Sequence, residues 1–340
     1  MKKQKKVLLG ILVLMPLAFM FTGCNKDNDN GPIVGYSMYN WMSGISDTTM
    51  LSELSIPGTH DSGTEKIGPG PAHTQNFSIA RQLNDGIRFL DIRLKKKDNK
   101  LQLYHSDYNC KVDFDIVLNW CKDFLETNTT EVILMSIKNE KEDEDITGYL
   151  NDLYFENNKW KDLFWRGNSS DLQGNCKDQL PALGEVRGKI VVFKRFEYVN
   201  SVPYFIDWYT EWDGAGRESE TFQIKAQSGF WYYIEDEYKE HDTHKKLDKV
   251  EKHLNSAHAS KAKDVYLTFN SIGYNGANGR TPYWYAWGSA DPQMNKGLEE
   301  FLLKNSGKHH WGIVVLDYYN NEEGNIDNNI VLFIVRSNFD

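Results

Sequence analysis

Short, uninterrupted apolar runs recur along this chain, and they constrain its fold more than any other feature. They lie at 132–137, 190–193, 265–269 and 313–316. A strand that is apolar at every position is typical of a parallel sheet covered on both faces, because neither face meets water. Stretches of helical spacing separate the runs, as in 114–125, where apolar residues recur every three or four positions. Alternating strands and helices predict the α/β class.

Weaker patterns complete the expected order of elements. We expect further strands over 54–56, 89–94, 101–105 and 231–234, helices over 238–258 and 292–303, and a closing apolar segment at 330–335. The stretches 159–181 and 198–221 fit no element and are predicted to be long loops at the rim of the fold. Periodicity leaves a closed barrel and an open, doubly wound sheet as alternatives.

Charged side chains follow the predicted strands. They are His60, Arg93, Lys138, Arg195, Asp236 and Asp317. The carboxyl ends of parallel strands are where a (β/α) barrel keeps its active site. His60 and Asp61 follow a predicted turn at Pro57-Gly58, and we expect the glycines on either side to let a ligand approach the backbone. Histidine titrates nearest neutral pH and is the usual residue for moving a proton, although most single loop histidines have no such task.

The composition of the chain limits the kinds of partner that it is expected to bind. The chain of 340 residues is 40% hydrophobic, which is ample for a large core. Its formal net charge is -9, and the first 23 residues carry four lysines and no acid, so removing them gives about -13. So acidic a protein is not expected to bind nucleic acid, and its overall charge does not attract it to anionic membranes.

The N-terminal sequence has the pattern of an export signal. Four lysines precede an apolar run at 7–21, which is short for a membrane span and ends at Phe-Thr-Gly before Cys24. Small residues before a cysteine resemble a bacterial lipobox, so we predict a signal peptide over 1–23 and a lipidated N-terminus with a flexible tether over 24–45. The acidic stretch 25–30 resembles a surface-export tag, which predicts an anchor on the outer membrane and possible display at the cell surface. An ordinary cleaved signal with a chance cysteine is the alternative.

The other cysteines and histidines give no metal pattern. Cys110, Cys121 and Cys176 have no zinc-ligand spacing, and one disulfide or buried free thiols are equally compatible with the sequence. The acidic run 143–145 and the pair His241 and His244 are expected to be solvated surface.

Three segments together resemble a known family. Gly-Ile-Arg-Phe-Leu-Asp-Ile-Arg at 86–93 is followed by Leu-Tyr-His at 103–105 and Val-Ile-Leu-Met-Ser-Ile-Lys at 132–138. In that order they resemble the X-box of the small bacterial phosphatidylinositol-specific phospholipases C, and the resemblance runs from about residue 52 to 317. It implies a distorted TIM-like (β/α) barrel in a single domain, here 46–340.

The resemblance also implies a reaction and its residues. The inositol 2-hydroxyl attacks its own phosphate, releasing diacylglycerol and inositol 1,2-cyclic phosphate. His60 matches the family's general base and Asp317 the carboxylate that orients it. His105 matches the general acid, with Asp61 beside it to keep it protonated.

Arg93 matches the family's phosphate clamp, and Asp91, two residues earlier on the same face of the strand, is placed to orient it. Calcium-dependent relatives bind the metal at places that here hold Asp61, Asp91, Arg93 and Lys138. Two cations among the four cannot ligate Ca²⁺, so no metal or other cofactor is expected.

The residues that would bind the inositol ring are also carried over from the family. They are Lys138, Arg195 with Lys194 as the alternative, Asp236, Tyr238, and Trp212-Asp213 at the pocket wall. The aromatic segment 282–287 resembles one near the family's barrel mouth, but Gly279-Arg280 stands where relatives carry an exposed tryptophan. The expected partner is phosphatidylinositol or a glycosylated (GPI) lipid at a membrane surface, acted on by a monomer. The alternatives are a phosphodiesterase for another head group and an inactive inositol- or glycan-binding lipoprotein.

Overall fold

The computed structural model describes residues 36–140, 145–167, 180–197, 205–226, 230–261, 264–320 and 329–339. The predicted signal peptide, Cys24 and most of the predicted tether lie outside these residues, as do Cys176 and most of the acidic run 143–145. Within the described ranges, every helix is too short or too polar to cross a bilayer.

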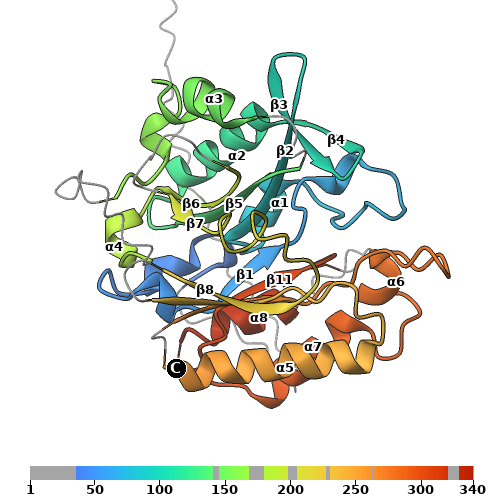
Figure 1. Cartoon of the computed structure of the whole chain (residues 1–340). Coiled ribbons are helices and arrows are strands. Elements are labelled where there is room, and N and C mark those ends of the chain that lie inside the picture. The colour runs from blue at the N-terminus through green and yellow to red at the C-terminus, as the bar shows by residue number, and fades with distance from the viewer. Residues whose placement is uncertain are drawn as a thin grey trace, which may run out of the picture.

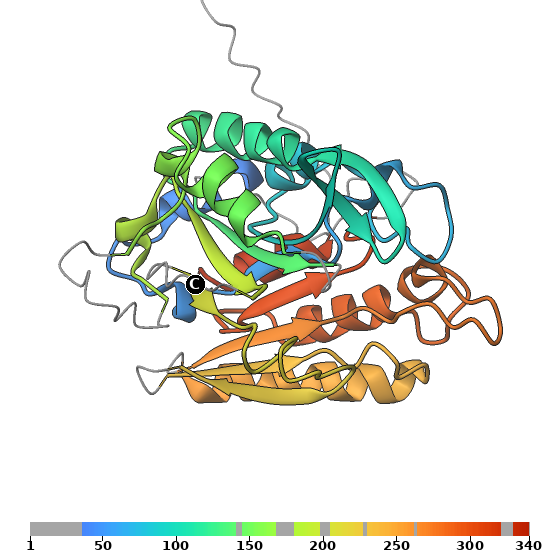
Figure 2. The same cartoon turned by 45° about the horizontal axis from the view of Figure 1, so that its top comes forward.

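The strands form one curled sheet (Figures 1 and 2). They are β1 Ile56–Thr59, β2 Phe89–Lys97, β3 Lys100–His105, β4 Tyr108–Asp113, β5 Ile133–Asn139, β6 Ile190–Arg195, β7 Ile206–Asp207, β8 Thr221–Lys225, β9 Trp231–Glu235, β10 Val265–Phe269 and β11 Ile313–Leu316. The spatial order is β7-β6-β5-β2-β1-β11-β10-β9-β8, and off this path β3 pairs with β2 and β4 pairs with β3. Neighbours from β7 to β9 are parallel, whereas β8 pairs antiparallel with β9. Among the described residues no ladder joins β7 to β8, so the barrel is open there.

Helices cover the outside of the sheet. They are α1 Ile79–Asn84, α2 Phe114–Thr127, α3 Thr147–Leu150, α4 Leu183–Val186, α5 Thr243–Ser260, α6 Pro282–Ala286, α7 Met294–Lys304 and α8 Asn329–Arg336. Figure 1 shows α2 and α3 on one side of the sheet and α5 and α7 on the opposite side. The apolar positions that predict a helix over 114–125 are the buried face of α2. The α/β class and the distorted barrel in a single domain are confirmed.

Aromatic side chains fill the barrel where the sheet stays open. The rings of Phe193 and Trp208 stack with centroids 4.0 Å apart. Trp208 also lies 5.7 Å from Tyr232 of β9 and 6.5 Å from Phe89 of β2, so it contacts both walls. All four residues are essentially inaccessible to solvent. This layer forms the floor beneath the carboxyl ends of the strands.

Several element boundaries differ from those predicted. Pro57 and Gly58 lie within β1 rather than in a turn, and the carbonyl of Pro57 accepts a hydrogen bond from Arg88 N (2.9 Å). The helix predicted from residue 238 begins at Thr243, because the Asp242 carboxylate caps it by accepting from two backbone N–H groups. The closing segment 330–335 lies within α8.

The packed structure begins before residue 46. Met38–Gly44 forms a 3₁₀ helix in which Trp41 and Met42 are buried. The Trp41 indole N–H donates to the carbonyl of Gly86 (3.0 Å). This part of the segment predicted as a tether is therefore packed against α1, α8 and the loop before β2, because an indole gains both apolar burial and a hydrogen bond there.

Candidate active site

The site lies at the carboxyl ends of β1 and its two neighbours. Thr59 of β1 pairs with Leu316 of β11, so the next residues, His60 and Asp317, come side by side. Their side chains meet, with His60 Nδ1 2.8 Å from Asp317 Oδ1. Strand register therefore brings close together two residues that are 257 positions apart.

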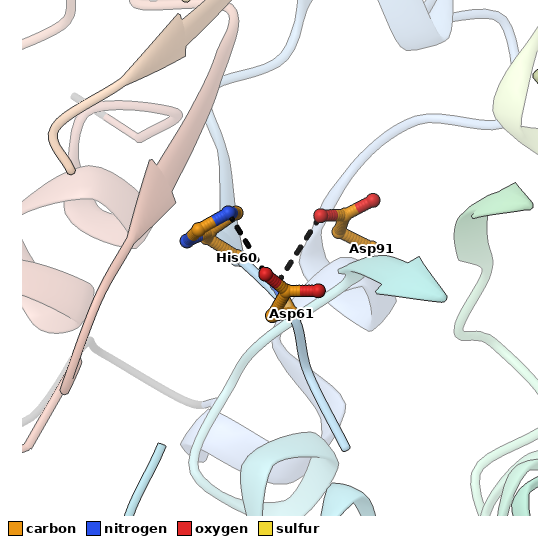
Figure 3. Close-up of side chains that lie close together, drawn as sticks. All are labelled: His60, Asp61 and Asp91. Atoms are coloured by element: carbon orange, nitrogen blue, oxygen red, sulfur yellow. Dashed lines mark hydrogen bonds and ion pairs between the residues drawn. The ribbon is translucent and has the colours of Figure 1, made fainter. Parts of the chain in front are cut away.

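His60 lies between two carboxylates. Its Nε2 is 3.1 Å from Asp61 Oδ2, and Asp61 in turn lies between His60 and Asp91 (Figure 3). Burial lowers the pKa of His60, but the charges of Asp61 and Asp317 outweigh it and raise the pKa to about 9. Burial raises the pKa of Asp317 despite the opposing His60. The resting site therefore holds His60 as an imidazolium at neutral pH.

The loop after β1 is fixed to β2. Asp61 has a left-handed backbone (φ 43°). Next to it, Ser62 N donates to the Asp91 carbonyl (3.0 Å) and Ser62 Oγ accepts from Asp91 N (2.9 Å). The expectation that glycines open this loop to a ligand is wrong. A Cβ on Gly58 would lie 2.8 Å from Phe89, and one on Gly63 would lie 2.1 Å from Leu103, so both glycines serve close packing.

Arg93 is surrounded by carboxylates. Its Nε lies 2.9 Å from Asp61 Oδ1, its Nη2 3.1 Å from Asp91 Oδ2 and its Nη1 3.9 Å from Glu140 Oε1. Burial lowers the pKa of Arg93, but these three charges raise it well above its usual value. Burial would raise the pKa of Asp91, yet Arg93 and Arg195 hold it well below its usual range. The guanidinium is thus a fixed positive charge at the centre of the site.

His105 enters from the end of β3. Its Nδ1 lies 3.0 Å from the Ala72 carbonyl and 3.2 Å from Asp61 Oδ2. Both neighbours are acceptors, so the geometry places a proton on Nδ1 and leaves Nε2 for other contacts. The ring centroids of His60 and His105 are 6.1 Å apart. One Asp61 oxygen therefore contacts both histidines.

A second cationic group lies on β5 and β6. Arg195 forms a bidentate pair with Asp213 (2.8 and 2.9 Å), and its guanidinium lies 3.6 Å from the Trp212 ring centroid. Lys138 Nζ is 3.5 Å from the same aspartate. Lys194 points elsewhere and pairs with Asp207 (3.0 Å). Arg195 rather than Lys194 therefore faces the site, because successive strand residues face opposite sides.

The two remaining predicted pocket residues follow β9. Burial raises the pKa of Asp236 to about 6, although Arg195 opposes the shift. Tyr238 is half-buried, and a Cβ on Gly273 would lie 3.1 Å from its ring. Asp236 therefore interacts electrostatically with Arg195 and Arg93.

His60, Asp61 and Asp91 each offer a ligand atom within 4.8 Å of the others, a spacing that suits a metal ion. The Arg93 guanidinium, however, already lies against both carboxylates. A divalent cation at this point would meet a fixed positive charge, so the residues present do not favour one.

Sequence reasoning missed Glu140, whose side chain is only 7% exposed. Besides contacting Arg93, its Oε1 accepts from Ser106 N (2.7 Å), next to His105, and its Oε2 lies 3.9 Å from Lys138. The sequence feature that could have identified Glu140 is its position two residues after Lys138, on the same face of the chain. Asp213 was foreseen only as a wall residue, because its sequence distance from Arg195 hides the bidentate pair.

The other sequence features lie around this centre or further out. Cys110 and Cys121 are buried free thiols. Burial raises the pKa of the Cys110 thiol, and the charges of Asp61, Glu140 and Arg93 also act on it, so Cys110 is near the centre. His241 contacts the Tyr285 hydroxyl (3.1 Å). In the aromatic segment Tyr285 is buried, whereas Tyr283, Trp284 and Trp287 are half-buried at the rim.

The fold and site define a barrel in which two histidines and an arginine gather around one aspartate. A family model described as phosphatidylinositol-specific phospholipase C, X domain, matches residues 67–196. A 1-phosphatidylinositol phosphodiesterase of Staphylococcus aureus (strain Newman) is 30% identical over 294 residues, covering 82% of this chain and 88% of that protein. Another, from strain NCTC 8325, is 28% identical over 333 residues, or 94% of each chain.

Solved structures agree. A variant of the S. aureus phosphatidylinositol-specific phospholipase C superposes with a TM-score of 0.75 at 26% identity, covering 89% of this chain and 97% of that one. The Listeria monocytogenes enzyme shares the fold, with a TM-score of 0.62 at 23% identity over 89% of this chain and 100% of that one. The chain belongs to the phosphatidylinositol-specific phospholipase C family.

Proposed function

We propose that this protein cleaves phosphatidylinositol to diacylglycerol and inositol 1,2-cyclic phosphate by acid–base catalysis without a metal ion. The observation that carries the proposal is the convergence of His60, His105 and Arg93 on Asp61. The family relatives, which are named for action on phosphatidylinositol, support the substrate.

Each histidine has one proton to move. The inositol 2-hydroxyl oxygen forms a bond to phosphorus and gives its proton to His60 Nε2. The bond from phosphorus to the glycerol oxygen breaks, and that oxygen takes a proton from His105 Nε2. At rest Asp61 lies at His60 Nε2 (3.1 Å), so the hydroxyl has to replace it there, and the imidazolium must first lose its proton. Asp317 holds the opposite nitrogen and fixes the ring.

Arg93 would bind the phosphate oxygens, since a guanidinium offers paired donors to an anionic group. The ring hydroxyls would contact Lys138, Arg195 and Asp236, with Tyr238 against the ring face. These residues combine charged hydrogen-bonding groups with one flat apolar surface, as a polyhydroxylated ring requires. A glycosylated phosphatidylinositol presents the same ring and phosphate, and is the second substrate to test.

We also propose that the protein is exported and anchored to the outer membrane through Cys24, with residues 1–23 removed. The lipobox-like sequence supports this placement. An S. aureus relative of known structure has been studied for its membrane binding. A lipid anchor would hold the barrel near its substrate, and the barrel would act as a monomer.

The first test is release of diacylglycerol from phosphatidylinositol vesicles, with and without EDTA. We expect equal rates. Cleavage that stops in EDTA and returns with calcium would contradict the metal-independent mechanism. Cleavage of sphingomyelin or glycerophosphodiesters but not of phosphatidylinositol would overturn the substrate, and inactivity on all of them would favour the binding-protein alternative.

The second test separates the histidines. His60→Ala and His105→Ala should each lose about 10²- to 10⁴-fold on phosphatidylinositol. On an inositol nitrophenyl phosphate the phenolate leaves with little need of an acid. His105→Ala should therefore recover much of its rate there, while His60→Ala should not. Equal recovery by both variants, or recovery by His60→Ala alone, would cancel or reverse the assigned roles.

A further inference from the structure

The chain leaves the sheet directly after the paired residues His60 and Asp317. The last bond between the two strands runs from His60 N to the Leu316 carbonyl (3.0 Å). The next residues, Asp61 and Tyr318, have left-handed backbones with φ of 43° and 44°. Non-glycine residues keep this conformation only where their surroundings hold it in place. The base and its carboxylate therefore depend on contacts other than the ladder.

Gln75 supplies one such contact from the loop between β1 and α1. Its Nε2 donates to the carbonyls of His60 (2.9 Å) and Leu316 (2.8 Å). The side chain is fully buried, so water does not compete for these bonds. A single amide group thus joins the ends of β1 and β11.

Asn295, in the first turn of α7, supplies the second contact. Its Nδ2 donates to the carbonyls of Asp317 (2.9 Å) and Tyr318 (3.1 Å). Its Oδ1 accepts from Asn270 Nδ2 (3.0 Å), which fixes the nitrogen end of the amide toward the two carbonyls. Asn295 is fully buried and Asn270 is 1% exposed.

We infer that Gln75 and Asn295 are positioning residues for the general base. Neither side chain contacts the His60 ring. Each holds the backbone that carries one member of the His60–Asp317 pair, and together they maintain the 2.8 Å contact between Nδ1 and Oδ1. The inference rests on the proposed function for its effect on rate, since a misplacement of about 1 Å can cost on the order of 10²-fold. Its effect on the titration of His60 needs no substrate.

The test uses Gln75→Leu and Asn295→Leu, which keep the side-chain size and remove both donors. Asn338→Leu is the matched control. Asn338 Nδ2 donates to the carbonyls of Ser55 (2.9 Å) and Val335 (3.0 Å), at the opposite end of β1. The readouts are the NMR titration of the His60 ring, and kcat and KM on phosphatidylinositol vesicles, all measured well below each variant's Tm.

We expect the His60 pKa to fall by about one unit in both variants, as the Asp317 charge moves away. We expect kcat to fall about tenfold or more, with KM within about twofold because the ring-binding residues lie on other strands. In an Asp317→Asn background, Asn295→Leu should add little to the loss. Asn338→Leu should change only stability.

The inference is overturned if both variants titrate and turn over like Asn338→Leu. If a leucine variant does not fold, Asn295→Ser and Gln75→Asn replace it, and an unchanged His60 titration in them has the same meaning. A shifted titration in a protein whose wild type does not cleave phosphatidylinositol would support the positioning role and refute the proposed function instead.

Discussion

Asp61 is the residue on which the other reactive groups depend. One of its oxygens contacts both histidines and the other contacts Arg93. From the sequence we expected Asp61 to lie beside His105 and did not expect a contact with His60. Its contact with His60 could not be predicted, because it depends on the left-handed turn at Asp61 and on the anchoring of Ser62 to β2. The sequence could indicate the residues that gather at the site, whereas it could not indicate the carboxylate that they share.

Arg93→Lys tests the fixed charge. Lysine keeps the charge but cannot reach Asp61 and Asp91 while presenting paired donors to a phosphate. We expect kcat to fall by about 10²-fold, similar to the loss of an oxyanion donor. The measurement is diacylglycerol release under saturating substrate, with Lys194→Arg as the control because that residue pairs with Asp207. A near-normal rate for Arg93→Lys would remove the clamp assignment.

The pH dependence should report His60. With a pKa of about 9, raised by Asp61 and Asp317 against burial, the base is mostly protonated at neutral pH. The kcat/KM for phosphatidylinositol should therefore rise with pH well above the usual histidine value of roughly 6.5. Asp317→Asn removes one of the two charges that raise the pKa of His60. In this variant the rise of kcat/KM with pH should therefore occur at lower pH, and the maximal rate should fall. A rise of kcat/KM at the same pH in the wild type and in Asp317→Asn would contradict this account.

At the scale of elements, the sequence predicted which strands carry the side chains that meet at the site, because polar side chains at the ends of apolar runs are easy to recognise. The sequence did not predict which side-chain contacts join one element to another. Glu140, Gln75 and Asn295 act on residues far away in the chain, through contacts that only the folded register creates. Gly63 was misread for the same reason, since its neighbour Leu103 lies on a separate strand.

Gly63→Ala tests the packing of the β1 loop. The new methyl group would lie 2.1 Å from Leu103 Cδ2. We expect a loss of about 1–3 kcal/mol in the free energy of unfolding, measured by urea denaturation. Gly68→Ala in the same loop meets no atom within 4 Å and should be close to neutral. Combined with Leu103→Ala, Gly63→Ala should cost less than alone, and strict additivity would show that the clash is not the cause.

At the scale of the whole molecule, an acidic protein holds three cations among carboxylates at the end of its barrel. The formal net charge is -9, yet Arg93, Lys138 and Arg195 gather at one end of the barrel. Carboxylates hold these cations in place. Because these carboxylates offset the cations, an anionic lipid head group would be bound by short-range hydrogen bonds to the site rather than drawn in by a net positive charge.

Cys24→Ala tests the proposed anchor. An acyl chain on residue 24 would add membrane affinity through buried methylene groups. The wild type should sediment with membranes, and the variant should be soluble or remain unprocessed, as judged by fractionation and by mass. Cys121→Ala, at a buried thiol, should still sediment. Fractionation and maturation of Cys24→Ala like the wild type would rule the anchor out.

The β1–β11 ladder has a consequence for how the protein is made. Among the described strands, it is the one ladder that connects β1–β7 with β8–β11. β11 is the last described strand in the sequence, yet its place is beside the first one. Pairings between such distant parts of a chain form slowly, so one edge of β1 stays open until β11 pairs with it. Because Asp317 comes with β11, a folding chain that has already buried His105 and Arg93 still lacks the carboxylate beside His60, and the site is completed by the last pairing.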